Sequence, residues 1–151
     1  MDIHLSYDWD TITSIITSPE NWEYMSDDFD ELEGFTPPKG DDKYYLLDGR
    51  GGLFMFYFIS PIHAQAHVCA LRHARGLKAV NSQKSAIKWI FQNTDCLKIT
   101  ALIPEFNKRV ERLSMAVGLK YEGRIEKCYM KHGCLRDQLI YGISKGRREY
   151  G

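Results

Sequence analysis

The chain has 151 residues, which is enough for one domain with a substantial core and too few for two ordinary domains. Hydrophobic residues make up 44% of it and charged residues 26%, a balance that is typical of a globular protein and excludes a disordered or fibrous chain. The longest apolar run, Leu53 to Ile59, has seven residues, whereas a membrane-spanning helix needs about 20. We therefore expect residues 1–151 to form one domain without a membrane span or a signal peptide.

The formal net charge of zero conceals two parts of opposite sign. Residues 1–50 hold 13 acidic and 3 basic side chains, a balance of −10, and residues 51–151 hold 7 acidic and 17 basic ones, a balance of +10. This division favours cationic partners on one side and anions such as phosphates on the other, although two merely solvated faces would look the same. The basic residues are scattered without interleaved aromatics, so nucleic acid is not an expected partner.

The four cysteines form no CxxC pair and are too sparse for a disulfide scaffold. They predict free thiols in a reducing, cytoplasmic compartment. Cys128 and Cys134 flank a predicted hairpin turn, and a contact between them is the alternative.

Helices and loops are predicted for the first forty residues. Asp8 or Asp10 can cap a helix whose apolar stripe is Ile12, Ile15 and Ile16. A second short helix follows around Glu20–Tyr24. The acidic run Asp27–Glu33 and the prolines after it predict an exposed loop.

Three strands are predicted next, over Tyr44–Leu47, Leu53–Ser60 and Ile62–Leu71, and turn residues join them into an antiparallel meander. The middle strand is apolar on both faces, as a central buried strand is. Alternation in the third strand separates two sets of side chains. One face carries His63, Gln65, His67 and Cys69, and the other carries Ala64, Ala66, Val68 and Ala70.

Helices and strands alternate in the rest of the chain. We predict a helix from Asn81 or Ser82 to about Asn93, a strand over Leu97–Ile103 and a helix over Asn107–Val117. Two further strands, Lys120–Met130 and Leu135–Ser144, flank a turn at residues 131–133. The fold class is α/β, with a mixed sheet flanked by helices.

The junction between the third strand and the following helix, residues 72–80, is basic and contains Gly76. A helix start offers free N–H groups and a positive dipole end, and Arg75 and Lys78 add charge, so the segment suits an anion. An ordinary strand–helix connection with solvated basic residues is the alternative.

The order of elements and two segments resemble the GNAT acetyltransferase superfamily, nearest its ribosomal-protein N-acetyltransferase branch. The first segment, Arg75–Val80, stands where that family has its pyrophosphate loop. The second combines the strand Ile99–Pro104 with a pattern of fixed spacing: Asn107, Leu113, Gly118-Leu119 and Tyr121-Glu122-Gly123. Gly133, Asp137 and Tyr141 also match the ribosomal-protein branch.

The resemblance implies that acetyl-CoA binds in a cleft where two parallel strands splay apart, here the strand ending near Leu71 and the strand Leu97–Ile103. Backbone groups of Val68–Leu71 would pair with the pantetheine arm, the amides of Arg75–Val80 would hold the pyrophosphate, and Asn107 would contact the cofactor. The implied cofactor-binding residues are Val68, Ala70, Leu71, Arg75, Gly76, Leu77, Lys78, Ala79, Val80 and Asn107.

Three positions depart from the family pattern. Lys78 and Val80 replace small residues of the phosphate loop, where glycine lets the backbone approach a ligand closely. Ser114 stands where many relatives have a tyrosine that protonates the leaving thiolate, and this leaves the general acid unassigned.

His67 is the first candidate for the general base that deprotonates the acceptor amine, and His63 is the second. An ordinary packed histidine is the alternative reading of each. A zinc site built from His63, His67, Cys69 and His73 would need a third element to converge on the ion, because strand neighbours i and i+2 are about 7 Å apart. No CxxC or HExxH motif supports it, so no metal is expected.

The expected activity is transfer of an acetyl group from acetyl-CoA to a primary amine of a protein N-terminus or a small molecule. The acidic run Asp27–Glu33 would steer a cationic acceptor. The alternative is a non-catalytic protein for virion or head assembly, since the Arg75-Gly76-Leu77-Lys78-Ala79 loop also resembles GNAT-like proteins of tailed bacteriophages. An edge strand near the C-terminus can pair with a second copy to form a homodimer.

Overall fold

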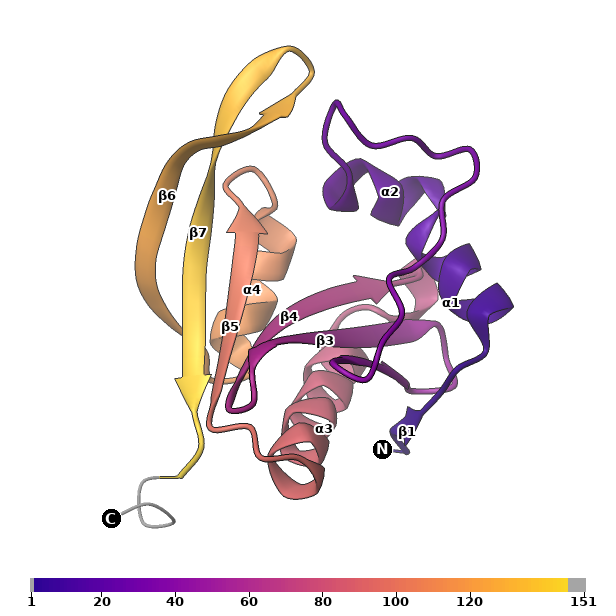
Figure 1. Ribbon diagram of the computed structural model, residues 1–151, viewed down its shortest axis with the longest axis vertical. Coiled ribbons are helices and arrows are strands. Elements are labelled where there is room, and N and C mark those ends of the chain that lie inside the picture. The colour runs from indigo at the N-terminus through magenta and orange to yellow at the C-terminus, as the bar shows by residue number, and fades with distance from the viewer. Residues whose placement is uncertain (1, 147–151) are drawn as a thin grey trace.

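The computed structural model describes residues 2–146, in which seven strands form one mixed sheet in the order β1-β2-β3-β4-β5-β7-β6 (Figure 1). The mixed α/β class is thereby confirmed. The elements are β1 (His4–Leu5), α1 (Trp9–Ile16), α2 (Pro19–Met25), β2 (Lys43–Leu47), β3 (Gly52–Ser60), β4 (His63–Ala70), the 3-10 helix η1 (Arg72–Ala74), α3 (Leu77–Asn93), β5 (Lys98–Pro104), α4 (Lys108–Ala116), β6 (Lys120–Lys131) and β7 (Cys134–Ser144).

The N-terminal helices cover one face of the sheet, which we call the front face. Asp8, not Asp10, caps α1 by accepting a hydrogen bond from the Thr11 N–H at 3.2 Å. The predicted isoleucine stripe of α1 is buried, with each side chain at most 2% exposed. It packs against inward-facing residues of β2, β3 and β4, namely Tyr45, Leu47, Leu53, Met55 and Cys69.

The helices α3 and α4 cover the opposite, back face of the sheet (Figure 1). Their buried side chains pack on the alternate residues of the same strands, because successive side chains of a strand point to opposite faces. This larger core includes Phe54, Phe56, Ala64, Ala66, Ile87, Ile90, Ile99, Ala101, Ile103 and Leu113. The two-sided burial of β3 and the predicted faces of β4 are confirmed.

The predicted meander is present, since β2, β3 and β4 pair antiparallel in sequence order. β5 lies parallel to β4, and β7 pairs antiparallel with both β5 and β6. The β6–β7 turn consists of His132 and Gly133, whose φ angles of 53° and 75° fit the two-residue turns that join twisted hairpin strands. β6 lies at one edge of the sheet.

The start of α3 differs from the sequence prediction. The helix begins at Leu77, four residues before the predicted cap at Asn81 or Ser82, and Gly76 with a φ of 86° precedes it. Ser82 has the side chain of a typical cap, but it is fully buried and donates its hydroxyl to Asp48 at 3.0 Å. A long-range partner, which local sequence rules cannot detect, therefore explains this serine.

The four cysteines are free thiols. Cys134 lies opposite Lys131 in the hairpin, whereas the Cys128 sulfur donates to Gln138 at 3.4 Å. The two thiols thus occupy different rungs of the ladder and do not face each other, contrary to the alternative that the sequence left open. None of the described helices is both long and apolar enough to cross a membrane.

Candidate active site

β4 and β5 are paired along only part of their length. Their parallel register runs from His63 opposite Lys98 to Ala66 opposite Ala101 and then ends. β4 continues beside β3 as far as Ala70, and β5 continues beside β7 as far as Pro104. The two strands therefore diverge toward their C-terminal ends, as Figure 1 shows, and the predicted splay is present.

A cavity of about 170 Å³ occupies this splay, and we call it the through-sheet cavity. Its wall includes His67 from the front face of β4 and Ala66 and Val68 from the back face. Helices of both layers also line it, α2 from the front and α3 and α4 from the back. The cavity consequently passes through the sheet between the strands. The remaining lining residues are Asn21, Tyr24, Met25, Gln83, Ala101, Leu102, Ile103, Pro104, Asn107, Arg109, Val110, Ser114 and Gln138.

The free edge of β4 presents backbone groups to this gap. The Leu71 N–H donates to the Gly51 carbonyl on the β3 side at 3.0 Å. Because backbone groups alternate in direction along a strand, those of Ala70 and Val68 face the opposite side, toward β5. Arg75 Nε already donates to the Ala70 carbonyl at 3.2 Å. Val68 is thus the residue of the predicted ligand-binding segment whose backbone N–H and C=O groups face the gap most directly.

A second cavity of about 240 Å³ lies on the back face between the start of α3 and α4. Three arginines line it, Arg75, Arg109 and Arg112, above a mainly apolar floor; we call it the arginine cavity. The other lining residues are Gly76, Ala79, Val80, Leu113 and Ala116. Arg109 lines both cavities, so the two are neighbours beside this side chain.

The charges around these cavities are of one sign. Burial and, next, the charge of Arg75 lower the pKa of Arg109. The Nη2 nitrogen of Arg75 is closed off from solvent and has no hydrogen-bond partner. Among the described residues, no aspartate or glutamate lines either cavity. Two neighbouring guanidinium groups without a carboxylate are costly in a protein, and an anionic ligand would offset that cost.

The start of α3 adds main-chain donors to the arginine cavity. The N–H groups of Ala79 and Val80 donate to the Gly76 carbonyl at 3.0 and 3.2 Å, whereas those of Gly76, Leu77 and Lys78 precede the first intrahelical bonds. The positive φ of Gly76 suits glycine best at this position. Lys78 and Leu77 are exposed, so the lysine that departs from the family pattern does not fill the cavity; Val80 does line it.

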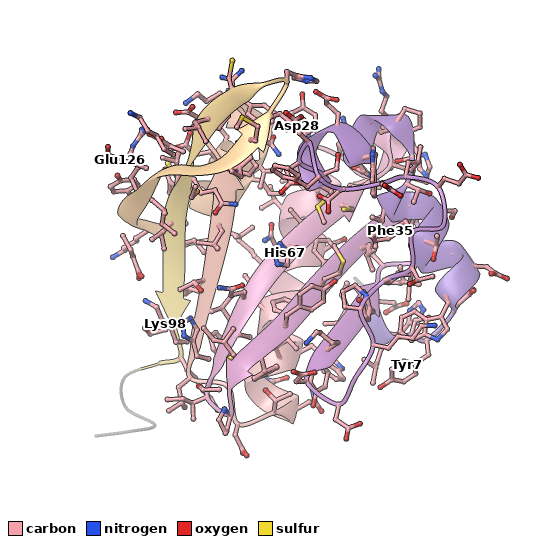
Figure 2. All side chains as sticks on the ribbon, turned by 45° about the horizontal axis from the view of Figure 1, so that its top comes forward. Tyr7, Asp28, Phe35, His67, Lys98 and Glu126 are labelled. Carbon is pink, nitrogen blue, oxygen red and sulfur yellow. The ribbon has the colours of Figure 1, made fainter. Side chains whose placement is uncertain are left out.

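His67 stands near the middle of the sheet on β4 (Figure 2) and lines the through-sheet cavity. Burial lowers its pKa to about 4, so the imidazole is neutral at physiological pH. Its ring centroid lies 5.2 Å from that of Tyr57. The structure thus places the first candidate base where the sequence predicted, at the gap between the strands.

His63 occupies a different environment. Its Nε2 atom lies 2.9 Å from the Thr100 hydroxyl, within the paired part of β4 and β5, and it lines neither cavity. His73 is exposed on η1. No group of three histidine, cysteine or acidic side chains among residues 2–146 is arranged to hold a metal ion.

Asn107 and Ser114 both line the through-sheet cavity from the α4 side. Asn107 caps α4, because its Oδ1 atom accepts a hydrogen bond from the Val110 N–H at 3.3 Å. Ser114 is 1% exposed. Asn107 therefore has a local structural role, as the cap of α4, in addition to the ligand contact that the resemblance implies.

Sequence reasoning missed Arg109 and Gln83. Gln83 lines the through-sheet cavity from α3, is 4% exposed and has an Oε1 atom without a hydrogen-bond partner. Both residues lie inside helices in which charged and polar side chains usually face water. Gln83 lies four residues after Ala79 and three before Ala86, both of which are buried. This helical spacing was the signal in the sequence that could have placed Gln83 on the buried side of α3.

The acidic run Asp27–Glu33 does not line either cavity. The Asp28 carboxylate accepts hydrogen bonds from the N–H groups of His132 and Gly133, each at 2.8 Å, and these bonds lower its pKa. Figure 2 shows Asp28 beside the tip of the β6–β7 hairpin. Lys131 strengthens the connection by donating to the Ser26 carbonyl at 2.8 Å. The loop thus holds the β6–β7 hairpin in place beside the through-sheet cavity on the front face.

Solved structures of other proteins share this architecture at low sequence identity. A ribosomal-protein-S5-alanine acetyltransferase from Vibrio fischeri superposes with a TM-score of 0.70 at 13% identity, over 96% of this chain and 93% of that one. A spermidine N-acetyltransferase from Vibrio cholerae, in complex with CoA and spermine, has a TM-score of 0.75 at 13% identity, over 95% and 94% of the two chains. A GNAT-family acetyltransferase from Bacillus anthracis has a TM-score of 0.59 at 17% identity, over 68% and 66%.

The chain therefore has the fold of the GNAT acetyltransferases, as the sequence predicted. The sequence itself matches no protein-family profile and no curated protein sequence.

Proposed function

We propose that the protein is an acetyl-CoA-dependent N-acetyltransferase that acts on a primary amine. The observation that carries this proposal is that the through-sheet cavity and the arginine cavity are neighbours that share Arg109 in their walls. A narrow opening between two strands suits an extended arm, and a cationic cavity behind it suits phosphates. The GNAT fold supports the same assignment, since the solved structures it resembles are acetyltransferases.

The residues present fit the nucleotide end of CoA. Arg75 has a buried nitrogen without a partner, Arg109 and Arg112 line the same cavity, and the N–H groups of Gly76, Leu77 and Lys78 precede the first intrahelical bonds of α3. Together they would hold the phosphates through charge and main-chain hydrogen bonds. Ala79 and Val80 would contribute the apolar floor.

The thioester arm would lie along the free edge of β4. Val68 and Ala70 would provide backbone groups, and Asn107 would lie beside the arm at the start of α4. Leu71 would contribute no amide, because its N–H is bound to Gly51. When bound, acetyl-CoA supplies the acetyl group as a thioester, on which an amine nitrogen can act as the nucleophile.

His67 would accept the proton that the acceptor nitrogen releases. Burial lowers the pKa of its imidazole to about 4, so the group is neutral at pH 7 and can accept a proton, but it is a weaker base than an ordinary histidine. Arg109 would hold positive charge between the two cavities and favour negative charge that develops nearby. Ser114 can donate a hydrogen bond from the cavity wall, although its hydroxyl is a much weaker acid than a tyrosine.

The acceptor would enter from the front, between α2 and the β6–β7 hairpin. A protein N-terminus and a small amine both remain in the proposal, because related folds are named for ribosomal-protein and spermidine acetylation. No described carboxylate lines the through-sheet cavity, so the acceptor nitrogen would not form an ion pair there. We do not propose the virion-assembly alternative, since no observation on the described residues favours it.

Thermal unfolding in the presence of CoA tests this function. A ligand at a hundred times its dissociation constant adds about 2.7 kcal/mol to stability, which corresponds to an increase in Tm of roughly 5–10 °C for a domain of this size. Replacement of Arg75 by alanine should weaken CoA binding by roughly 10- to 100-fold, because charge-assisted hydrogen bonds are lost.

The matched control is Arg72→Ala. Arg72 is three residues away and 80% exposed in its side chain, and its ion pair with Glu20 lies outside both cavities. This variant should bind CoA as the wild type does. If millimolar CoA leaves the Tm of the wild type unchanged, the proposed function is wrong.

A further inference from the structure

Gln83 is an unusual member of the buried side of α3. The residues at the neighbouring buried positions of that helix are small or apolar, for example Ala79, Ala86 and Ile90. Ser82 is also polar and buried, but Asp48 accepts its hydroxyl hydrogen at 3.0 Å. The Gln83 Oε1 atom has no such partner although the residue is 4% exposed. The oxygen of its amide is therefore a buried acceptor that the described protein leaves unsatisfied.

The polar residues that share the cavity wall, such as Asn107 and Ser114, give the Gln83 Oε1 atom no hydrogen bond. The back-face strand residues of the same wall are Ala66, Val68, Ala101 and Ile103, all with apolar side chains. Buried carbonyl oxygens without a donor are rare in folded proteins because their desolvation is not compensated. A leucine of similar size would avoid the penalty at this site. The amide is thus explained more readily by a ligand than by the packing of α3.

We propose that Gln83 is a binding residue for the pantetheine arm of CoA, with its side-chain amide oxygen accepting a hydrogen bond from an amide N–H of the arm. This inference rests on the proposed function. Gln83 lies on the wall of the through-sheet cavity, which shares Arg109 with the neighbouring arginine cavity. The amides of the arm are its N–H donors between the phosphates and the sulfur, so they match an unpaired acceptor at this place.

The test compares Gln83→Leu with the wild type by calorimetric titration with two ligands, CoA and adenosine 3′-phosphate 5′-diphosphate, the nucleotide part of CoA without the arm. Gln83→Leu should bind CoA about tenfold more weakly, because an N–H of the arm then loses its acceptor. It should bind the nucleotide as the wild type does. The unliganded variant should be at least as stable to heat as the wild type, since an unsatisfied polar group has been removed.

Two further variants complete the experiment. Gln92→Leu makes the same chemical change at an exposed position near the end of α3 and should affect neither ligand. Gln83→Met keeps an unbranched side chain of similar length and replaces Gln83→Leu if the leucine variant does not fold; the same tenfold loss for CoA alone is expected.

The outcomes separate the two proposals. Wild-type affinity of Gln83→Leu for CoA, or an equal loss for both ligands, overturns the role of Gln83 while leaving the proposed function in place. The first result would indicate a bound water as the natural partner of the amide, and the second a distorted α3. Failure of the wild type to bind CoA at all would instead contradict the proposed function itself, and the role of Gln83 with it.

Discussion

The two halves of the β4–β5 pair differ although the same strands build them. In the first half, His63–Ala66 pair with Lys98–Ala101, and the His63 ring lies 2.9 Å from the Thr100 hydroxyl. In the second half, the strands separate and the side chains around them line a cavity. The first half is a closed sheet interior, and the second is an opening lined by both polar and apolar side chains.

Two histidines on one strand face make the contrast specific. His63 and His67 are four residues apart, yet only His63 has a hydrogen-bond partner across the strand pair. His67 lies at the gap, where burial lowers its pKa to about 4 without a compensating partner. His63 and His67 therefore share residue type and strand face. Only their positions relative to the splay differ, and His67 is the one whose side chain is available for chemistry.

Filling the open half should have the largest effect on ligand binding. We expect Val68→Phe to remain folded, because its side chain can extend into the cavity, and to bind CoA more than about 100-fold more weakly because the path through the sheet is blocked. Titration with CoA and a thermal melt check both expectations.

A phenylalanine introduced in the closed half is the control. Ala64 is 0% exposed and lines neither cavity, so Ala64→Phe should lower stability by roughly 1–3 kcal/mol or more through overpacking. Normal CoA affinity in a folded Val68→Phe variant would contradict the position that we assign to the arm.

Removal of the His67 imidazole should lower turnover, not cofactor affinity. General-base catalysis typically contributes about 10²- to 10⁴-fold, so His67→Ala should reduce kcat by at least about 100-fold at saturating acetyl-CoA. His63→Ala should retain the wild-type kcat, because His63 lines neither cavity. Equal rates for His67→Ala and the wild type would remove His67 as the proton acceptor.

The pH dependence of stability should show the smallest effect. The folded-state pKa of His67 is about 4, below the ordinary value of 6.5, so the unfolded chain binds a proton that the folded chain does not. This group's contribution is fully present above pH 6.5 and declines as the pH falls toward 4, by up to roughly 3 kcal/mol. Urea unfolding at several pH values should show this loss in the wild type and a smaller one in His67→Gln. Parallel curves for the two proteins would mean that His67 is not buried in its neutral form.

Much of the fold could be predicted because local rules apply to it. Alternation identified both faces of β4, and the isoleucine spacing identified the buried side of α1. The start of α3 could not be predicted correctly, since Ser82 satisfies a local rule for a cap while its actual partner, Asp48, is 34 residues away. Gly76, which ends the preceding turn with a positive φ, was the better signal.

The candidate site could be predicted in part. The basic segment at the start of α3 and His67 were found from residue type and position, and both lie at the cavities. Arg109 was missed because charged side chains of a helix usually face water, and Gln83 was missed although its spacing from Ala79 and Ala86 places it on the buried side of α3. The acidic run was expected to guide an acceptor, but the Asp28 carboxylate accepts hydrogen bonds from N–H groups at the tip of the β6–β7 hairpin.

The amino-acid sequence by itself determined the order of the elements, their buried faces and the basic segment at residues 72–80, because periodicity and turn residues act over a few positions. Only the tertiary structure decided where β4 leaves β5 and which side chains reach the resulting gap. That decision depends on contacts between residues far apart in the chain, such as those that bring Arg75 of the α3 start close to Arg109 of α4. His67 and Gln83 become buried only when the helices pack on the two faces of the sheet. The lowered pKa of His67 and the unpaired amide oxygen of Gln83 are consequences of that burial.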